Sequence, residues 1–227
     1  MKIALVGDYD ATVLAHQAIP DAIERSARAL ASKVEPIWIH SSEIDLQAIA
    51  AVDALWCVPL SPYADPEAVI TVIHFAREHD MPFLGTCAGY QHAVLEYARN
   101  VLGFVDADSS EDNPETSMPL ITALACRLAD QTDTIHLDHG SRIAGIYQTE
   151  QITEEYNCGF GINPDYLPLF VNSDFSFCAR DDNGDPRAFE LNSNRFFIGT
   201  AYQPERSSLQ QITHPLITAF LMAALQS

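Results

Sequence analysis

Basic residues and long apolar runs are both scarce in this sequence. Its 227 residues include 12 Lys and Arg against 31 Asp and Glu, which gives a net charge of −19 at pH 7. So acidic a chain is a poor partner for nucleic acid or for an anionic membrane, because both attract basic residues. No apolar run reaches the roughly 18 to 20 residues that a membrane span needs, and the chain begins with a short strand-like run rather than a signal peptide. We therefore expect a cytoplasmic protein that binds neither nucleic acid nor membrane.

Cysteines are too few and too scattered for a disulfide framework or a zinc knuckle. The five cysteines are odd in number and include no Cys-x-x-Cys pair, so a reducing compartment fits best. His136 and His139 lack a nearby cysteine or third histidine with which to bind zinc. The acidic stretch at 106–115 is typical of a solvated loop, and no glycine-rich phosphate loop is present. The sequence thus predicts no metal and no cofactor.

Short β-rich runs alternate with helical patterns through the first half of the chain. Strand-like runs fall at 3–7, 36–40, 55–59 and 82–85, and 66–79 has a helical pattern. Another helix is expected to begin at Pro20, because proline is favoured in the first turn of a helix. This alternation predicts a doubly wound α/β fold, with a mostly parallel sheet and helices on both faces. The length suits a single domain over 1–227.

The second half of the chain is interrupted by turn residues, and its pieces are predicted to be extra, short antiparallel strands. Asn183-Gly184 lies between the runs 175–179 and 187–191. Asn-Gly supplies the positive φ that a hairpin turn needs, so these runs predict a β-hairpin. A last strand is expected at 196–201 and a closing helix at 214–225.

A strand-like run at 81–86 leads directly into the motif Gly85-Thr86-Cys87-Ala88-Gly89 and then into a helical pattern. Gly-x-Cys-x-Gly at a strand-to-helix junction is typical of a nucleophile elbow. Both glycines are needed because the nucleophile occupies a strained turn where a larger side chain would clash. The Cys87 thiol then lies at a helix N-terminus, which favours the thiolate, and the Ala88 N–H can point at a developing oxyanion. The alternative is a buried cysteine that packs as a small apolar side chain.

The segment around this motif resembles a known enzyme family. The run from Phe83 to Gly103 is similar to the glutaminase domain of CTP synthase, a class I glutamine amidotransferase, and weaker similarity extends over essentially the whole chain. The resemblance implies a doubly wound α/β fold and a Cys-His-Glu triad, whose cysteine forms a γ-glutamyl thioester and releases ammonia. Cys87 matches the nucleophile, and Glu205 matches the triad carboxylate.

The triad base is the first departure from the family pattern. Where the family has Phe-His-Pro-Glu, this chain has Tyr202-Gln203-Pro204-Glu205. A carboxamide cannot accept a proton near neutral pH, so Gln203 cannot act as a general base. His139, with His136 beside it, is a candidate for a relocated base; the alternative is that both are ordinary loop histidines.

The oxyanion loop and the substrate pocket also depart from the family. Residues 58–63 read Val-Pro-Leu-Ser-Pro-Tyr in place of Val-Pro-Gly-Gly-Phe-Gly, which leaves the N–H groups of Leu60 and Ser61 as candidate oxyanion donors. The segment 155–161 lacks the arginine with which the family holds the glutamine carboxylate, and a desolvated carboxylate needs a cation. Arg142 is the nearest cation in the sequence; it either binds a different anion or is an ordinary surface arginine. The candidate substrate contacts are Tyr90, Gln91, Arg142 and Phe160.

These departures lead to three hypotheses of function. The favoured one is a diverged cysteine hydrolase that uses Cys87 to cleave an amide or acyl bond of a small molecule other than free glutamine. The second is a catalytically silent pseudo-amidotransferase that binds a small-molecule ligand or regulates another protein. The third is a glutaminase subunit that supplies ammonia to a separate synthetase, since the sequence contains no ATP-dependent synthetase domain.

Overall fold

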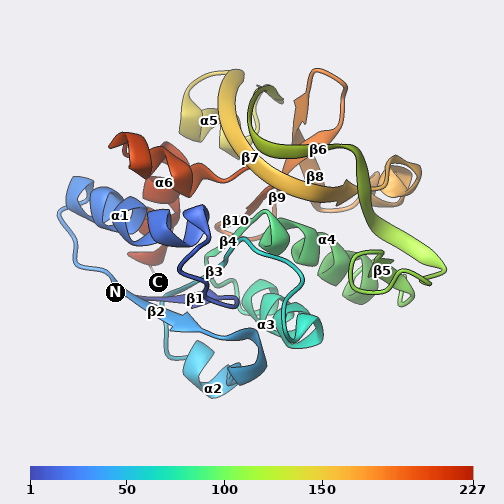
Figure 1. The fold of residues 1–227 in the computed structure, drawn as a ribbon. Helices are drawn as coiled ribbons and strands as arrows, with labels where there is room; N and C mark the ends of the chain where they lie inside the picture. The colour runs from blue at the N-terminus through green and yellow to red at the C-terminus, as the bar shows by residue number, and fades with distance from the viewer. Residues whose placement is uncertain (227) are drawn as a thin grey trace.

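The computed structural model describes residues 1–226, except for the side chains of residues 125–130, among which Cys126 falls. Its α-helices are α1 (Leu14–Ala29), α2 (Leu46–Ile49), α3 (Pro66–Glu78), α4 (Ala88–Asn100), α5 (Arg142–Tyr147) and α6 (Pro215–Ala224), and its 3₁₀ helices are η1 (Ser41–Glu43), η2 (Pro164–Phe170) and η3 (Pro204–Gln210). Its strands are β1 (Lys2–Val6), β2 (Glu35–Ile39), β3 (Ala54–Cys57), β4 (Phe83–Thr86), β5 (Ala107–Ser109), β6 (Met118–Leu137), β7 (Gln151–Ile162), β8 (Phe175–Asp181), β9 (Pro186–Leu191) and β10 (Phe197–Thr200). Figure 1 shows how they are arranged.

A single mixed sheet joins these strands in the order β2-β1-β3-β4-β10-β9-β8-β6-β5, with β7 paired to β6. The first part is parallel, since β1 pairs with β2 and β3, and β4 pairs with β3 and β10. From β10 onward, the pairs β10–β9, β9–β8, β8–β6 and β6–β7 are antiparallel. The predicted α/β class and the hairpin β8–β9 are therefore confirmed, with antiparallel strands added in the second half.

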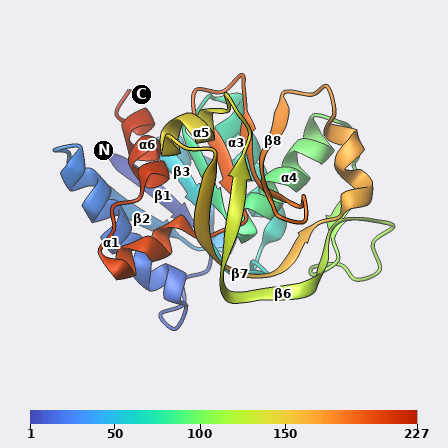
Figure 2. The ribbon, with the colours of Figure 1, turned by 90° about the horizontal axis from the view of Figure 1, so that it is seen from above.

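Helices cover both faces of the parallel part of the sheet, as predicted. Helix α1 packs against α6 on one face, whereas α3 packs against α4 on the other (Figures 1 and 2). Strand β4 lies between β3 and β10, and all its residues are buried. Its carboxyl end therefore lies in the middle of the sheet edge, where doubly wound folds bind their ligands. In the part of the chain described here, no helix is both long enough and apolar enough to cross a membrane.

Two strands of the second half are much longer than predicted. Strand β6 has 20 residues and β7 has 12, and their pairing extends from Ile121 with Ile162 to His136 with Gln151. Polar residues in β6, such as Gln131, remain in the strand and expose their side chains to solvent. The expectation of short pieces was wrong because polar residues on the outer face of a strand look like turn residues in the sequence.

Helix α1 begins earlier than predicted. Its first residue is Leu14, and Pro20 lies inside the helix rather than at its start. An internal proline removes one backbone hydrogen bond. However, Ala15, Ile19 and Ile23 are buried on one face of α1, and burying that apolar face outweighs the lost bond.

Candidate active site

Cys87 lies in the turn between β4 and α4 with φ 51° and ψ −103°. A positive φ is strained for any residue with a side chain. The Cys87 N–H donates to the Thr200 carbonyl over 2.8 Å, which ties the turn to the end of β10. The backbone thus adopts the sharp strand-to-helix turn that the Gly-x-Cys-x-Gly pattern predicts.

The two glycines beside Cys87 are required by close backbone contacts. A Cβ on Gly85 would lie 2.8 Å from the carbonyl carbon and oxygen of Gly89. A Cβ on Gly89 would lie 2.2 Å from the Cys57 carbonyl oxygen. The first turn of α4 can therefore pack against β3 and β4 only if both positions lack a side chain.

Replacing Gly89 with alanine is expected to lower the free energy of unfolding by about 3 kcal/mol, because the new methyl group forces the backbones of α4 and β3 apart. Urea unfolding followed by circular dichroism measures the change. Gly145→Ala in α5 is the matched control, since nothing lies within 4 Å of its added Cβ. Equal stability of the two variants would contradict the close packing described here.

The Cys87 sulfur is surrounded by hydrogen-bonding groups. Its Sγ lies 2.8 Å from the Sγ of Cys158 in β7 and 3.7 Å from the Asn157 carbonyl oxygen, to which it donates as a thiol. The Ala88 N–H and the Gln203 side chain also hydrogen-bond to this sulfur. The hydrogen bond from Cys158 is the main cause that lowers the pKa of Cys87, and Ala88 and Gln203 add to it against the effect of burial. The same contact, together with burial, raises the pKa of Cys158. The contact therefore favours a thiolate at Cys87 over a thiolate at Cys158.

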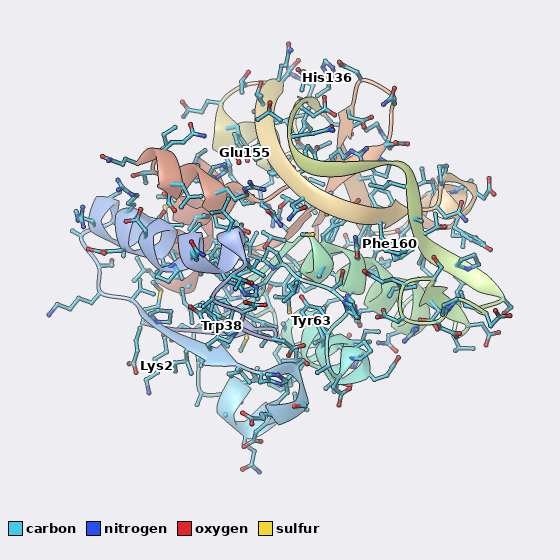
Figure 3. All side chains as sticks on the ribbon, in the orientation of Figure 1. Lys2, Trp38, Tyr63, His136, Glu155 and Phe160 are labelled. Carbon is cyan, nitrogen blue, oxygen red and sulfur yellow. The ribbon has the colours of Figure 1, made fainter. Side chains whose placement is uncertain are left out.

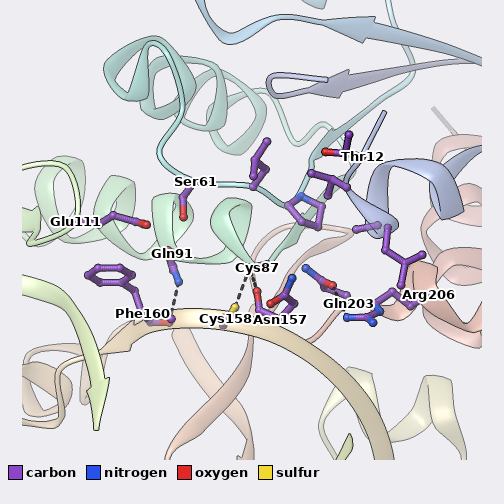
Figure 4. Close-up of a pocket in the computed structure, with 16 residues that line it drawn as sticks. Thr12, Ser61, Cys87, Gln91, Glu111, Asn157, Cys158, Phe160, Gln203 and Arg206 are labelled. Atoms are coloured by element: carbon purple, nitrogen blue, oxygen red, sulfur yellow. Dashed lines mark hydrogen bonds between the residues drawn. The ribbon is translucent and has the colours of Figure 1, made fainter. Parts of the chain in front are cut away.

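A cavity of about 620 Å³ opens over this pair, a volume suited to a small molecule. Figure 4 shows its lining, which comes from the start of α1, the loop after β3, α4, β7 and η3. The lining residues are Thr12, Val13, Leu14, Ala15, Pro59, Leu60, Ser61, Cys87, Gln91, Glu111, Asn157, Cys158, Gly159, Phe160, Gln203 and Arg206. No histidine is among them in the described part of the chain. The cavity therefore has a cysteine nucleophile candidate without an imidazole beside it.

Several of the residues predicted for the site come together at the cavity. Leu60 and Ser61 line it from the loop after β3, and Gln203 lines it from the segment after β10. Gln91 donates from Nε2 to the Phe160 carbonyl over 2.9 Å, which joins α4 to β7 across one wall (Figure 4). Leu60, Ser61, Gln203 and two of the four candidate substrate contacts, Gln91 and Phe160, thus line one cavity, and their roles there stay predictions.

Other predicted residues lie away from the cavity. Tyr90 is buried on another side of α4, where its hydroxyl donates to the Pro186 carbonyl over 3.2 Å. Arg142 donates to the Asn194 carbonyl over 2.9 Å, so it fixes a loop. The His139 side chain is 91% exposed. These three residues are not among those that line the cavity, because their own elements turn them toward other partners.

His136, the other histidine considered as a relocated base, also lies outside the cavity lining. Its Nε2 is 2.7 Å from the Asp182 carboxylate, and both side chains are exposed. Figure 3 shows His136 at the periphery of the molecule. The structure thus places this histidine in a solvent-exposed hydrogen bond with Asp182 near the end of β6.

Glu205 is buried below the cavity with no partner in another described residue. Neither of its carboxyl oxygens accepts a hydrogen bond from another residue in the described part of the chain. Burial is the main cause that raises the pKa of Glu205 well above its usual range, and the Cys87 charge acts in the same direction. Glu205 therefore holds its proton to higher pH than an exposed glutamate.

The raised pKa of Glu205 makes the free energy of unfolding depend on pH. A carboxyl whose pKa is higher in the folded state stabilises the fold fully below its unfolded pKa of about 4.3, and that contribution is lost as pH rises toward the folded pKa. Glu205→Gln cannot ionise, so we expect the variant to gain stability relative to the unaltered protein between about pH 5 and pH 8. Urea unfolding at both pH values measures this gain. The exposed Glu35→Gln is the control, and an identical pH dependence for both variants would contradict the buried, unpartnered state.

Sequence reasoning missed two important residues of the cavity. Cys158 is 71 residues from Cys87 in the sequence, and the two meet because β7 passes beside the Cys87 turn. The sequence feature that could have indicated Cys158 is its position on the buried face of a strand with alternating burial. Arg206 is 5% exposed, forms an ion pair with Glu155 at 3.0 Å, and lies 3.4 Å from the Gln203 Oε1. It follows Glu205 directly and brings a cation to a pocket that lacks the family's arginine.

The sharp turn at Cys87 follows a central parallel strand and leads directly into α4, which is the strand–turn–helix arrangement of an α/β protein with an elbow. Residues 15–223 match the model of the family "Glutamine amidotransferase class-I". The chain therefore belongs to this family, as the resemblance implied.

Relatives with known names support this assignment. The chain is 33% identical to CTP synthase of Sulfolobus acidocaldarius over 240 residues and 35% identical to that of Caldivirga maquilingensis over 239 residues. These matches cover 99% of this chain but only 45% and 44% of the two relatives. The chain thus spans less than half their length.

Solved structures show the same fold. The glutaminase domain of Trypanosoma brucei CTPS with bound acivicin is 22% identical and superposes with a TM-score of 0.90, over 100% of this chain and 94% of that one. A glutamine amidotransferase of Thermotoga maritima is 10% identical with a TM-score of 0.62, over 100% and 96%. At these identities the comparison concerns the fold alone.

Proposed function

We propose that this protein is a diverged cysteine hydrolase of the glutamine amidotransferase type, which cleaves an amide or acyl bond of a small molecule other than free glutamine. The observation that carries the proposal is the Cys87–Cys158 contact of 2.8 Å in a cavity whose described lining residues include no histidine. A thiolate, rather than a thiol, is the nucleophile in such chemistry. A neighbouring thiol that donates a hydrogen bond to Cys87 stabilises that thiolate without an imidazole.

The acylation step uses groups already beside Cys87. The thiolate forms a C–S bond with the substrate carbonyl, and the carbonyl electrons move to oxygen, where the Ala88 N–H and an N–H of Leu60 or Ser61 stabilise them. The C–N or C–O bond then breaks, and the leaving atom takes a proton from Cys158. Cys158 becomes a thiolate, while Cys87 becomes an uncharged thioester.

Deacylation reverses the roles of the two sulfurs. The thioester no longer accepts a hydrogen bond as a thiolate does, so Cys158 is free to take a proton from water. The resulting hydroxide adds to the thioester carbonyl, and collapse of the adduct releases the acid and restores the Cys87 thiolate. Protons and charge therefore balance over one turnover with the two cysteines and one water.

Arg206 suggests the charge of the substrate. It is a buried cation that lines the cavity and also contacts Glu155. A desolvated guanidinium binds carboxylates and phosphates with directed hydrogen bonds. We therefore expect the substrate to carry an anionic group close to the bond that is cleaved.

Glutamine hydrolysis, with ammonia passed to a separate synthetase, is the second candidate function. It is favoured by the similarity to CTP synthases, of which this chain spans less than half. Acivicin, which the T. brucei domain binds, serves as a probe for this candidate. Labelling of Cys87 by acivicin, together with ammonia release from glutamine, would support it.

The experiment that tests the proposed function compares glutamine with a panel of anionic amides, such as γ-glutamyl-p-nitroanilide. We expect at least one amide to be hydrolysed at a rate that Cys87→Ala abolishes, while glutamine remains at background. Cys87-dependent ammonia release from glutamine would replace the proposal with the second candidate. No Cys87-dependent turnover, together with an unreactive thiol, would indicate a silent binding module.

A further inference from the structure

The contact between Cys87 and Cys158 is close enough for a second kind of chemistry. The two sulfurs lie 2.8 Å apart, whereas a disulfide bond is about 2.05 Å long, so roughly 1 Å of approach or less would join them. Cys87 belongs to the elbow and Cys158 to β7, and both line the cavity. Small reagents can therefore reach them through the same opening.

The two thiols also differ in the way that a nucleophile and its resolving partner must differ. The hydrogen bond between them lowers the pKa of Cys87 and raises that of Cys158. Oxidants react with a thiolate, and a protonated cysteine close by then resolves the oxidised sulfur. Cys57 and Cys178 differ from this pair, since burial raises the pKa of each.

We propose that Cys87 and Cys158 form a redox-active dithiol whose oxidant is a small hydroperoxide. The Cys87 thiolate attacks the terminal peroxide oxygen, the O–O bond breaks, and Cys87 becomes a sulfenic acid as an alkoxide or hydroxide leaves with the bonding electron pair. Cys158 then attacks the Cys87 sulfur and gives up its proton, so that a disulfide forms and water leaves. The peroxide is reduced by two electrons, and each sulfur is oxidised by one.

The disulfide removes the nucleophile of the proposed hydrolase. Cys87 in a disulfide has no thiolate to attack a carbonyl. A small dithiol such as dithiothreitol restores both cysteines by thiol–disulfide exchange, taking the oxidation onto itself. The cavity therefore alternates between a reduced form that is competent for acyl transfer and an oxidised form that is not.

The test is peptide mapping by mass spectrometry without reduction, after the full chain is treated with one equivalent of hydrogen peroxide. We expect a Cys87–Cys158 cross-linked peptide with the loss of two hydrogens, reversed by dithiothreitol, while the peptides of the other three cysteines remain unchanged. Cys158→Ser is expected to accumulate a sulfenic acid on Cys87 that dimedone traps. Cys178→Ser is the matched control and should still form the cross-link.

Two results would overturn the proposal. One is a Cys87 that is not oxidised under these conditions, and the other is a Cys87 that proceeds to sulfinic acid equally fast with and without Cys158. Neither readout needs an acyl substrate, so the redox-active dithiol is tested independently of the proposed hydrolase. A cross-link without amide turnover would support the redox-active dithiol and contradict the proposed hydrolase. Amide turnover without a cross-link would support the hydrolase and contradict the dithiol.

Discussion

Replacing Gln203 with histidine is expected to raise the steady-state hydrolysis of a chromogenic ester, such as p-nitrophenyl acetate, by about 10²- to 10⁴-fold at neutral pH. The Gln203 side chain already hydrogen-bonds to Cys87, so an imidazole there would be within reach of the nucleophile and of the water that deacylates it. Glu205 lies two residues further on with no partner for its carboxyl oxygens. It would orient the imidazole and stabilise its charged form.

The controls for this gain separate a proton acceptor from a change of shape. Gln203→Met has a side chain of similar size that cannot accept a proton, and it should show no gain. Adding Glu205→Gln to Gln203→His should remove most of the gain, because the imidazole loses its carboxyl partner. Equal rates for Gln203→His and Gln203→Met would refute the idea that a base is what this position lacks.

Replacing Cys87 with alanine is expected to abolish the burst of p-nitrophenol that marks an acyl-enzyme, and to lower ester hydrolysis by on the order of 10³-fold or more. The reason is that the acyl group has no other activated sulfur to join. Stopped-flow absorbance measures the burst, and intact mass detects the acetylated chain. Cys178→Ala, in strand β8 of the hairpin, is the control and should retain the burst. A burst of unchanged size in Cys87→Ala would place the nucleophile elsewhere.

The elbow could be predicted because its determinants are contiguous in the sequence. Gly85 and Gly89 flank Cys87 within one short segment, so the motif can be recognised locally, although the contact that forbids a Cβ at Gly89 is with the Cys57 carbonyl of β3. The alternation of strands and helices in the first half is equally local. These features need no knowledge of distant residues, and the fold class followed from them.

The partners of Cys87 could not be predicted in the same way. Cys158 reaches Cys87 through the length and register of β6 and β7, which pair over most of their residues. Polar residues on the exposed side of β6 concealed that length. The side chains of Arg142 and His139 have charges suited to the site, but α5 and the end of β6 direct them elsewhere. Charge and residue type therefore indicate which residues could belong to the site, while tertiary packing determines which of their side chains reach the cavity.

Gln203 and Glu205 were predicted together, but their physical states differ from a working triad. No other residue that the structure describes hydrogen-bonds to the buried Glu205 carboxyl, and such burial is costly unless the carboxyl stays protonated. Cys87 contacts Cys158 and Gln203 rather than an imidazole among the residues that the structure describes.

We propose that Cys87 is a thiolate at neutral pH without the help of a histidine, and its alkylation by iodoacetamide from about pH 5 to pH 9 measures this. Peptide mass spectrometry follows each cysteine, with Cys158→Ala as the variant that removes the main hydrogen-bond donor. We expect Cys87 to react selectively, with an apparent pKa well below the ordinary value of about 8.5, and Cys158→Ala to raise this pKa. A Cys87 that is inert, or that titrates at about 8.5 or above in the unaltered protein, would show that this cysteine is an ordinary buried thiol.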